Sequence, residues 1–245
     1  MTPDDLVSAV SPTIRDIGWA YFFAPETVAH AQSLGLDVIT FYFVGRGGAL
    51  GDVEASVVHS AWGYFNPDLL GGMWEAGRAV IAPRDAGREF FAAAAGFGRA
   101  RLADAGDLTA FCAAADAVLA AADPVGLPLF AAWVAEPRAD DPPARATQQL
   151  HVLRELRGSA HLLAVRAVGL DDLTAHVLTR PGDMAMFGWS DDDKPPTTEA
   201  DQQAHVEAEA LTDRLVLPAW SVLDDAGRDA FVDGLARIEA AFTAA

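Results

Sequence analysis

Apolar residues recur at three- and four-residue spacing along much of this chain, in segments rich in alanine. The clearest stretch covers residues 86–122, where the alternation typical of strands is absent. Such spacing places apolar side chains on one face of a helix, and alanine has the highest helix propensity. The sequence therefore predicts a mainly α fold. With 245 residues, the chain is long enough to bury about 70% of its unfolded surface.

Three breaks interrupt the helical segments. The first is the turn sequence Asp123–Gly126, which ends a helix expected to begin after Asp107. The second and third breaks, at residues 137–145 and 190–202, are rich in proline and charge. We expect both to be exposed loops between helices.

A short internal similarity indicates two related halves. GLDVITFYFVGRGG at residues 35–48 (the first matching segment) aligns without gaps with GLDDLTAHVLTRPG at residues 169–182 (the second), with identity at six of fourteen positions. Each follows a helical stretch and supplies a glycine for a turn, an aspartate cap and a second helix, which is the outline of a helix-turn-helix unit. We therefore expect tandem duplicated helix-turn-helix units with extra helices, in halves formed by residues 1–125 and 126–245.

The end of the chain passes from a helix through a short apolar run to a long amphipathic helix, an order that suits a winged-helix unit. Four segments also carry a resemblance to a known family: YFFAPE (21–26), LGLDVITFYFVGRGGALGDV (34–53), VVHSAWGYFNP (57–67) and LRELRGSAHLLAVRAVGLD (153–171). Over most of its length the chain resembles an actinobacterial helix-turn-helix-like family. The resemblance implies a pair of winged-helix-like units and assigns no activity.

Aromatic residues concentrate between Tyr21 and Pro67, a segment that holds all three tyrosines. Polar side chains lie among them, and an aromatic cavity would use such groups to orient a planar or anionic ligand. The residues assigned to this candidate ligand site are Tyr21, Glu26, Tyr42, Arg46, His59, Trp62 and Asn66. The alternative is a core in which the aromatics pack two helices together, with Arg46 paired to nearby Asp52 or Glu54.

Arg46 lies within the glycine-rich run GRGGALG, residues 45–51. The run lacks the Lys-Ser/Thr pair and the preceding strand of a phosphate-binding loop. A guanidinium there can hold a carboxylate through two hydrogen bonds while the backbone approaches closely, or the glycines only allow two helices to meet. Arg46 aligns with Arg180, and we expect the two arginines to occupy matching positions. A buried guanidinium needs an internal acid or a bound anion.

A second candidate group lies on the helix expected over residues 145–167. Arg154, Arg157 and His161 follow one another at spacings that place them on one helix face. Arginines beside an imidazole can bind an anion and move a proton near neutral pH, so Arg157 and His161 are added to the ligand site. The alternative is a polar face whose arginines pair with Glu155 or other acids.

The sequence predicts no metal site and no cofactor. It has no HExxH, HxxxH or cysteine–histidine spacing, and the remaining histidines are scattered along the chain. The single cysteine, Cys112, is interpreted as a small buried residue.

Charge limits the expected partners. The chain has 35 acidic and 17 basic residues and a net charge of -18, which disfavours nucleic acid without excluding it. The densest basic cluster is interleaved with acids and indicates a solvated helix face; it consists of Arg78, Arg84, Arg88, Arg99 and Arg101. No apolar run reaches the roughly 20 residues that span a bilayer, and the first residues lack the positive charge of a secretory signal. We expect a cytoplasmic protein with no membrane partner.

These observations leave three functions open. The first expectation is a small-molecule-binding protein, regulatory in role, with Arg46 as the anchor for a planar or anionic ligand. The second is a metal-independent enzyme that uses Glu26, His59 or His161 as acid or base beside Arg46. The third is a DNA-binding regulator, although the candidate recognition helices carry one base each, at the end.

Overall fold

The computed structural model of the chain describes residues 1–243. These residues form twelve α-helices, two short 3-10 helices and no β-strand, which confirms the mainly α prediction. The first six helices are α1 (Pro3–Ile17), α2 (Pro25–Ser33), α3 (Val38–Gly48), α4 (Ala55–Trp62), α5 (Pro67–Arg78) and α6 (Pro83–Arg101). They are followed by α7 (Thr109–Ala121), α8 (Pro128–Val134), α9 (Pro142–Ala167), α10 (Asp172–Thr179), η1 (Met184–Phe187), η2 (Asp191–Asp193), α11 (Glu199–Trp220) and α12 (Asp225–Thr243).

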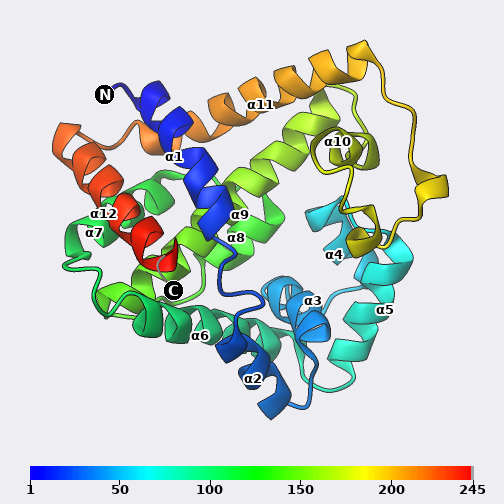
Figure 1. The fold of residues 1–245 in the computed structure, drawn as a ribbon, viewed down its shortest axis with the longest axis horizontal. Coiled ribbons are helices and arrows are strands. Elements are labelled where there is room, and N and C mark those ends of the chain that lie inside the picture. The colour runs from blue at the N-terminus through cyan, green and yellow to red at the C-terminus, as the bar shows by residue number, and fades with distance from the viewer. Residues whose placement is uncertain (244–245) are drawn as a thin grey trace.

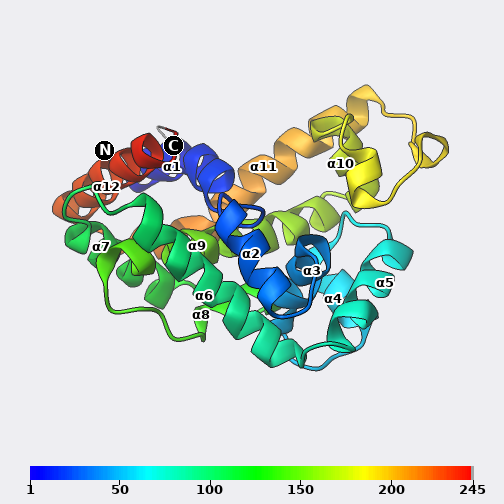
Figure 2. The same ribbon diagram turned by 60° about the horizontal axis from the view of Figure 1, so that its bottom comes forward.

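Helix α9 crosses the middle of the molecule (Figure 1) and packs against α6, α7, α8 and α11. Helices α1, α7 and α12 lie at one end of α9, whereas α3, α4 and α5 lie toward the other end (Figures 1 and 2). Because α9 is largely surrounded, several of its polar side chains are buried too and need partners. Gln148 donates to the Phe91 carbonyl at 3.0 Å, and Gln149 donates to the Cys112 carbonyl at 2.9 Å.

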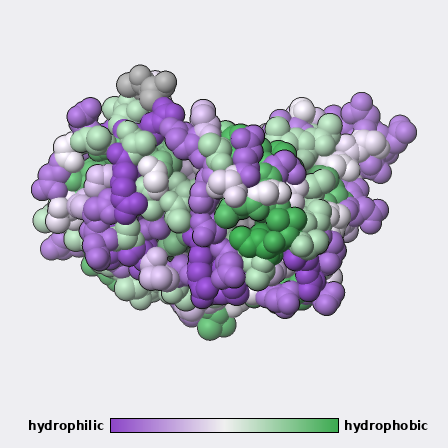
Figure 3. All heavy atoms as spheres, turned by 90° about the horizontal axis from the view of Figure 1, so that it is seen from below, coloured by the Kyte–Doolittle hydropathy of each residue, from purple (hydrophilic) through white to green (hydrophobic). Residues whose placement is uncertain are grey.

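One hydrophobic cluster runs through most of the fold. It extends from Leu6 in α1 to Ile238 in α12 and includes Trp74 and Trp133, on opposite sides of the expected boundary at residue 125. The two expected halves therefore share a core, and their separation into units remains a prediction. A smaller cluster around Ala164 packs the end of α9 against α10 and α11. On the face shown in Figure 3, hydrophilic residues cover most of the surface around one hydrophobic area.

The two matching segments have the same local structure at their start. Gly35 and Gly169 both have positive φ, at 79° and 87°. This left-handed conformation commonly follows the end of a helix, and glycine adopts it without the steric strain of a side chain. Asp37 and Asp171 then cap α3 and α10, and each accepts hydrogen bonds from the backbone and hydroxyl of the threonine three residues later. This agreement supports the proposed duplication without testing its origin.

The segments differ at their ends. Helix α3 continues to Gly48 and holds Arg46 in its last turn, whereas α10 ends at Thr179 and leaves Arg180 as its C-cap. The apolar run that was expected to separate the last two helices also differs from expectation, because Val216–Trp220 continues α11 with Pro218 inside it. No β-hairpin wing forms there, nor elsewhere in residues 1–243.

The glycines around Arg46 allow α3 to touch α6. A Cβ atom on Gly48 would meet the Pro83 carbonyl oxygen and come within 2.9 Å of the Gly87 nitrogen, and one on Gly45 would lie 2.8 Å from Phe90. Real Cβ atoms do not approach other atoms so closely, and here the neighbours at Gly48 are backbone. Close helix packing, one of the two interpretations of this run, is therefore observed.

Replacing Gly48 with Ala should destabilise the protein because neither backbone can move without separating α3 from α6. We expect a loss of about 2 kcal/mol, which lowers the melting temperature by roughly 4–8 °C in a domain of this size. Gly96→Ala is the matched control, since Gly96 lies in α6 with nothing within 4 Å of the added Cβ and should gain a few tenths of a kcal/mol or more. Equal melting temperatures for the two variants would contradict this packing.

Candidate functional site

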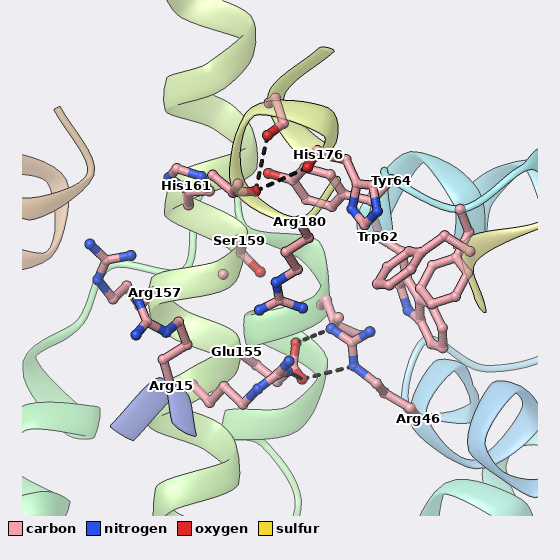
Figure 4. Close-up of a pocket in the computed structure, with 18 of the residues that line it drawn as sticks. Arg15, Arg46, Trp62, Tyr64, Glu155, Arg157, Ser159, His161, His176 and Arg180 are labelled. Carbon is pink, nitrogen blue, oxygen red and sulfur yellow. Dashed lines mark hydrogen bonds and ion pairs between the residues drawn. The ribbon is translucent and has the colours of Figure 1, made fainter. Parts of the chain in front are cut away.

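A pocket of about 530 Å³ opens beside the middle of α9. Helices α3 and α4 form one wall, α9 forms another, and α10 with η1 closes a third side (Figure 4). The volume is in the range of small-molecule sites, which is about 300–1,000 Å³. The residues that line it and carry polar side chains are Arg15, Asp16, Tyr42, Arg46, Trp62, Tyr64, Arg154, Glu155, Arg157, Ser159, His161, His176, Thr179, Arg180 and Glu209.

The charge of this pocket is opposite to that of the whole chain. Five arginines line it against three carboxylates, whereas the chain as a whole has twice as many acids as bases. Four of the arginines are held by acids that also face the pocket or adjoin it, and two of these, Arg46 and Arg154, share Glu155. Arg15 pairs with Asp16 at 2.8 Å, and Arg157 contacts both Glu209 and Asp213.

Arg46 and Glu155 form the floor of the pocket. The Arg46 Nε and Nη2 atoms donate to the two oxygens of Glu155, each at 2.8 Å, and Nη1 donates to the Tyr42 hydroxyl at 3.1 Å. The guanidinium also lies over the Trp62 ring, 4.3 Å from its centroid. The acid expected beside Arg46 was Asp52 or Glu54, but the observed partner is Glu155 from α9, since Asp52 accepts from Arg78 instead.

This pair is deeply buried, with 11% of the Arg46 side chain and 1% of the Glu155 side chain exposed. Burial would raise the pKa of Glu155, but Arg46 and then Arg154 outweigh it and lower this pKa to about 2. Burial also opposes the charge of Arg46, yet Glu155 and Tyr42 raise its pKa above the ordinary value. Both groups are therefore charged, and Glu155 neutralises one of the two arginines it contacts.

Arg180 differs from the other arginines of the pocket. Its guanidinium points toward Glu155 and Arg46 in Figure 4, but it has no carboxylate within 4.0 Å among the described residues. Its position follows from the α10 C-cap, where the chain leaves the helix. The sequence alignment of Arg180 with Arg46 therefore connects two pocket residues, because both arginines line one pocket, Arg46 from α3 and Arg180 from the end of α10.

Several polar atoms on the pocket wall are buried without a hydrogen-bond partner among the described residues. They include the Tyr64 hydroxyl, the Ser159 hydroxyl, the Arg154 Nε and the His176 Nε2. Buried polar groups are satisfied in more than nine cases of ten, and each exception calls for a physical reason. With Trp62 Nε1 and Arg157 Nε there are six such atoms on residues that line this pocket, and their concentration favours a polar ligand or solvent as that reason.

Tyr64 is held in a strained conformation at the rim. Its φ of 61° lies in the left-handed region, which costs a bulky residue about 1 kcal/mol or more. The backbone nitrogen donates to Asp172 at 2.8 Å, and the carbonyl accepts from Trp189 at 2.7 Å. These contacts from α10 and from the loop after η1 fix the tyrosine against the pocket. Burial raises the pKa of its hydroxyl, so the group remains protonated.

Of the nine residues predicted for the ligand site, the structure brings five to this pocket: Tyr42, Arg46, Trp62, Arg157 and His161. The other four lie elsewhere. Tyr21 is in the core, where its hydroxyl contacts buried His151 at 3.2 Å. Glu26 pairs with Arg101, His59 contacts the Phe65 carbonyl, and Asn66 caps α5. Glu26 and His59 are therefore not beside Arg46, and of the three acid–base candidates of the enzyme hypothesis His161 is the one that lines the pocket.

Most aromatics of the Tyr21–Pro67 segment belong to the core, and only one edge of them faces the pocket. Phe41, Phe43 and Phe65 are buried, and Phe43 stacks on Trp62 with ring centroids 5.6 Å apart. The expectations of a core and of a pocket thus each describe part of this segment. The prediction omitted Tyr64, Ser159, His176 and Glu209 as ligand-site residues, since their position depends on how α10 and α11 pack against α9.

This arrangement defines an all-helical protein whose helix-turn-helix segments enclose an arginine-lined pocket. A family model described as a helix-turn-helix family matches residues 8–245, so the chain belongs to this helix-turn-helix family, as its resemblance indicated. Neither the curated proteins nor the solved structures contain a match. Among residues 1–243, none of the helices has the length and apolar character needed to cross a membrane.

Glu155→Gln should weaken the protein in a pH-dependent way. The pKa of Glu155 is about 2 in the folded protein against an ordinary value of 4.5, so its ionised form stabilises the fold above about pH 4.5, and this contribution is lost as the pH falls toward 2. Near pH 7 we expect a deficit of about 3 kcal/mol, because Arg46 loses its buried partner.

Urea unfolding of both proteins from pH 7 down to pH 3 measures this deficit, which should shrink on acidification. Glu239→Gln, on the exposed side of α12, is the control and should leave the stability nearly unchanged at every pH. A deficit for Glu155→Gln that stays constant with pH would contradict the lowered pKa.

Proposed function

We propose that this protein binds a small anionic ligand with a planar group in the pocket between α3, α4, α9 and α10, and that it serves as a ligand-binding member of its helix-turn-helix family. The observation that carries the proposal is the collection of five arginines around one cavity in a chain of net charge -18. Concave sites with a few convergent polar groups are typical of small-molecule recognition. A local positive field also attracts anions into the cavity.

The shape and chemistry of the walls favour a planar ligand. Trp62, Tyr64 and Phe187 provide aromatic surface on one side, and Phe187 stacks on Phe65 with ring centroids 4.3 Å apart. Facing them, Ser159 and Arg154 bring unpartnered donors from α9. Flat aromatic surface opposite hydrogen-bond donors suits an aromatic or conjugated carboxylate.

Within this site the anionic group is proposed to meet Arg180. The sequence suggested Arg46 as the anchor, but both of its outer hydrogen-bonding edges are taken by Glu155 and Tyr42. Arg180 lies on the pocket wall without a carboxylate partner, so binding a ligand there sacrifices no existing ion pair. Arg46 then keeps a supporting role, since it holds Glu155 and orients Trp62.

Arg180→Ala tests this assignment. A panel of aromatic carboxylates is screened against the wild-type protein by tryptophan fluorescence and thermal shift, because Trp62 lines the pocket. For a carboxylate that binds, we expect Arg180→Ala to weaken binding by about tenfold to a hundredfold, the scale of one charge-assisted hydrogen-bonded contact of 1.5–3 kcal/mol. The melting temperature without ligand should change little, since removing Arg180 leaves no carboxylate without its ion-pair partner.

Arg166→Ala is the matched control, because Arg166 is an exposed arginine of α9 outside the pocket. It should bind the same carboxylate as the wild type does. If no carboxylate of the panel binds, or if both arginine variants bind equally, the proposed site is wrong.

DNA binding is the second candidate, and the family description favours it. Two observations weigh against it. Eight of the eleven residues of α3 are buried, and α10 buries Thr174–Val177, whereas a recognition helix must present an exposed face to a groove. The basic cluster is also neutralised, because each of its arginines pairs with an acid: Arg78 with Asp52, Arg84 with Glu136, Arg88 with Asp85, Arg99 with Asp141 and Arg101 with Glu26.

We therefore expect only weak, non-specific DNA binding. A mobility shift with mixed-sequence duplexes at low salt should show no discrete complex, because the net charge opposes the release of counterions from DNA. Tight binding that weakens steeply as salt is added would favour DNA binding over small-molecule binding as the function.

A further inference from the structure

Two histidines and a glutamate, carried by two helices that are far apart in the sequence, meet at the outer edge of the pocket. His205 and Glu209 lie one turn apart on α11, and His161 faces them from α9. One ring nitrogen of each histidine and one carboxylate oxygen of Glu209 lie within 4.8 Å of one another. This group was not visible as a motif, since the sequence offers only a histidine and a glutamate four residues apart, a common helical pair.

The contacts inside the group direct one oxygen toward both rings. Arg157 donates to the Oε2 atom of Glu209 at 2.7 Å, which leaves Oε1 at 3.7 Å from His161 Nδ1 and 3.9 Å from His205 Nε2. Carboxylates that bind metals are commonly held in this way by a hydrogen bond to the second oxygen. The Nδ1 atom of His205 is buried without a partner among the described residues.

We propose that His161, His205 and Glu209 bind a divalent transition-metal ion of the zinc class at the edge of the pocket. Donors at about 2.0–2.2 Å from zinc in tetrahedral geometry are separated by about 3.3–3.6 Å. The Glu209 Oε1 atom, at 3.7 and 3.9 Å from the two ring nitrogens, lies within a few tenths of an ångström of this separation, and His161 Nδ1 would exchange its contact with the Thr212 hydroxyl, at 3.0 Å, for the ion. Two imidazoles and one carboxylate form the donor set of many zinc sites that keep a further position open.

The surroundings suit the ion. The side chains of His161 and His205 are 18% and 21% exposed, so the group is sheltered yet reachable from solvent. His161 and Glu209 also line the pocket, so an open position on the ion would face the same cavity as Arg180.

This inference does not depend on the proposed anionic ligand, because it rests on a separate group of side chains. The test uses full-length protein treated with a chelator and then titrated calorimetrically with zinc chloride. We expect one ion per chain. Both His205→Ala and Glu209→Gln should weaken binding by at least about tenfold, and more where a direct ligand is lost.

Two further measurements make the test specific. Cobalt(II) in place of zinc should give the visible absorption of a low-coordinate N,O site in the wild type and lose it in both variants. His30→Ala is the matched control, because His30 also contacts a carboxylate, Glu89 at 2.9 Å, but has no second histidine beside it. It should bind zinc as the wild type does.

Loss of helical circular dichroism identifies a variant that fails to fold. If a ligand variant fails in this way, His205→Gln is used in its place. His205 is partly exposed, so this substitution leaves the core intact. Zinc binding that is absent, that exceeds one ion per chain without saturation, or that survives in both ligand variants would overturn the proposal. Binding lost equally in His30→Ala would overturn it as well.

Discussion

The ion pair between Arg46 and Glu155 is the interaction on which the pocket depends. It joins α3, in the first helix-turn-helix segment, to the central helix α9, and Glu155 is the one carboxylate within 4.0 Å of the buried Arg46 guanidinium among residues 1–243. The glycines beside Arg46 let α3 lie against α6, and this contact brings the guanidinium to α9. The close packing of α3 on α6 and the ion pair with α9 thus both fix the position of α3.

The two helix-turn-helix segments of this chain are unlike DNA-reading units in one respect. Their second helices, α3 and α10, turn inward and contribute Arg46 and Arg180 to opposite walls of one cavity. A recognition helix that is buried in the fold cannot enter a groove, but it can supply side chains to an internal site. The proposed ligand-binding role agrees with the general observation that a fold hosts different functions through different sites.

The sequence predicted those parts of the protein that depend on neighbouring residues. The helical spacing, the glycine turns at Gly35 and Gly169, and the aspartate caps of α3 and α10 all follow from local chemistry and are observed. The same reasoning failed at the apolar run around Pro218, where packing on the core keeps α11 helical through the proline. Propensity is a weak guide where tertiary contacts are strong.

The site was predicted only in part because its residues come from helices distant in the chain. Five of nine candidates face the pocket, but the partner of Arg46 was sought among nearby acids, whereas Glu155 lies 109 residues away. The sequence connects Arg180 with the pocket through its alignment with Arg46. No comparable signal connects His205 to His161, since their approach depends on the packing of α11 on α9.

The central claim is that Glu155 neutralises Arg46 inside the protein, so that Arg46 supports the pocket instead of waiting for a ligand. A double-mutant cycle with Arg46→Ala, Glu155→Ala and the double variant, measured by urea unfolding without ligand, tests this most directly. The account predicts a coupling energy of at least about 1.5 kcal/mol, with the double variant less destabilised than the sum of the single variants. Additive effects, with a coupling near zero, would contradict it.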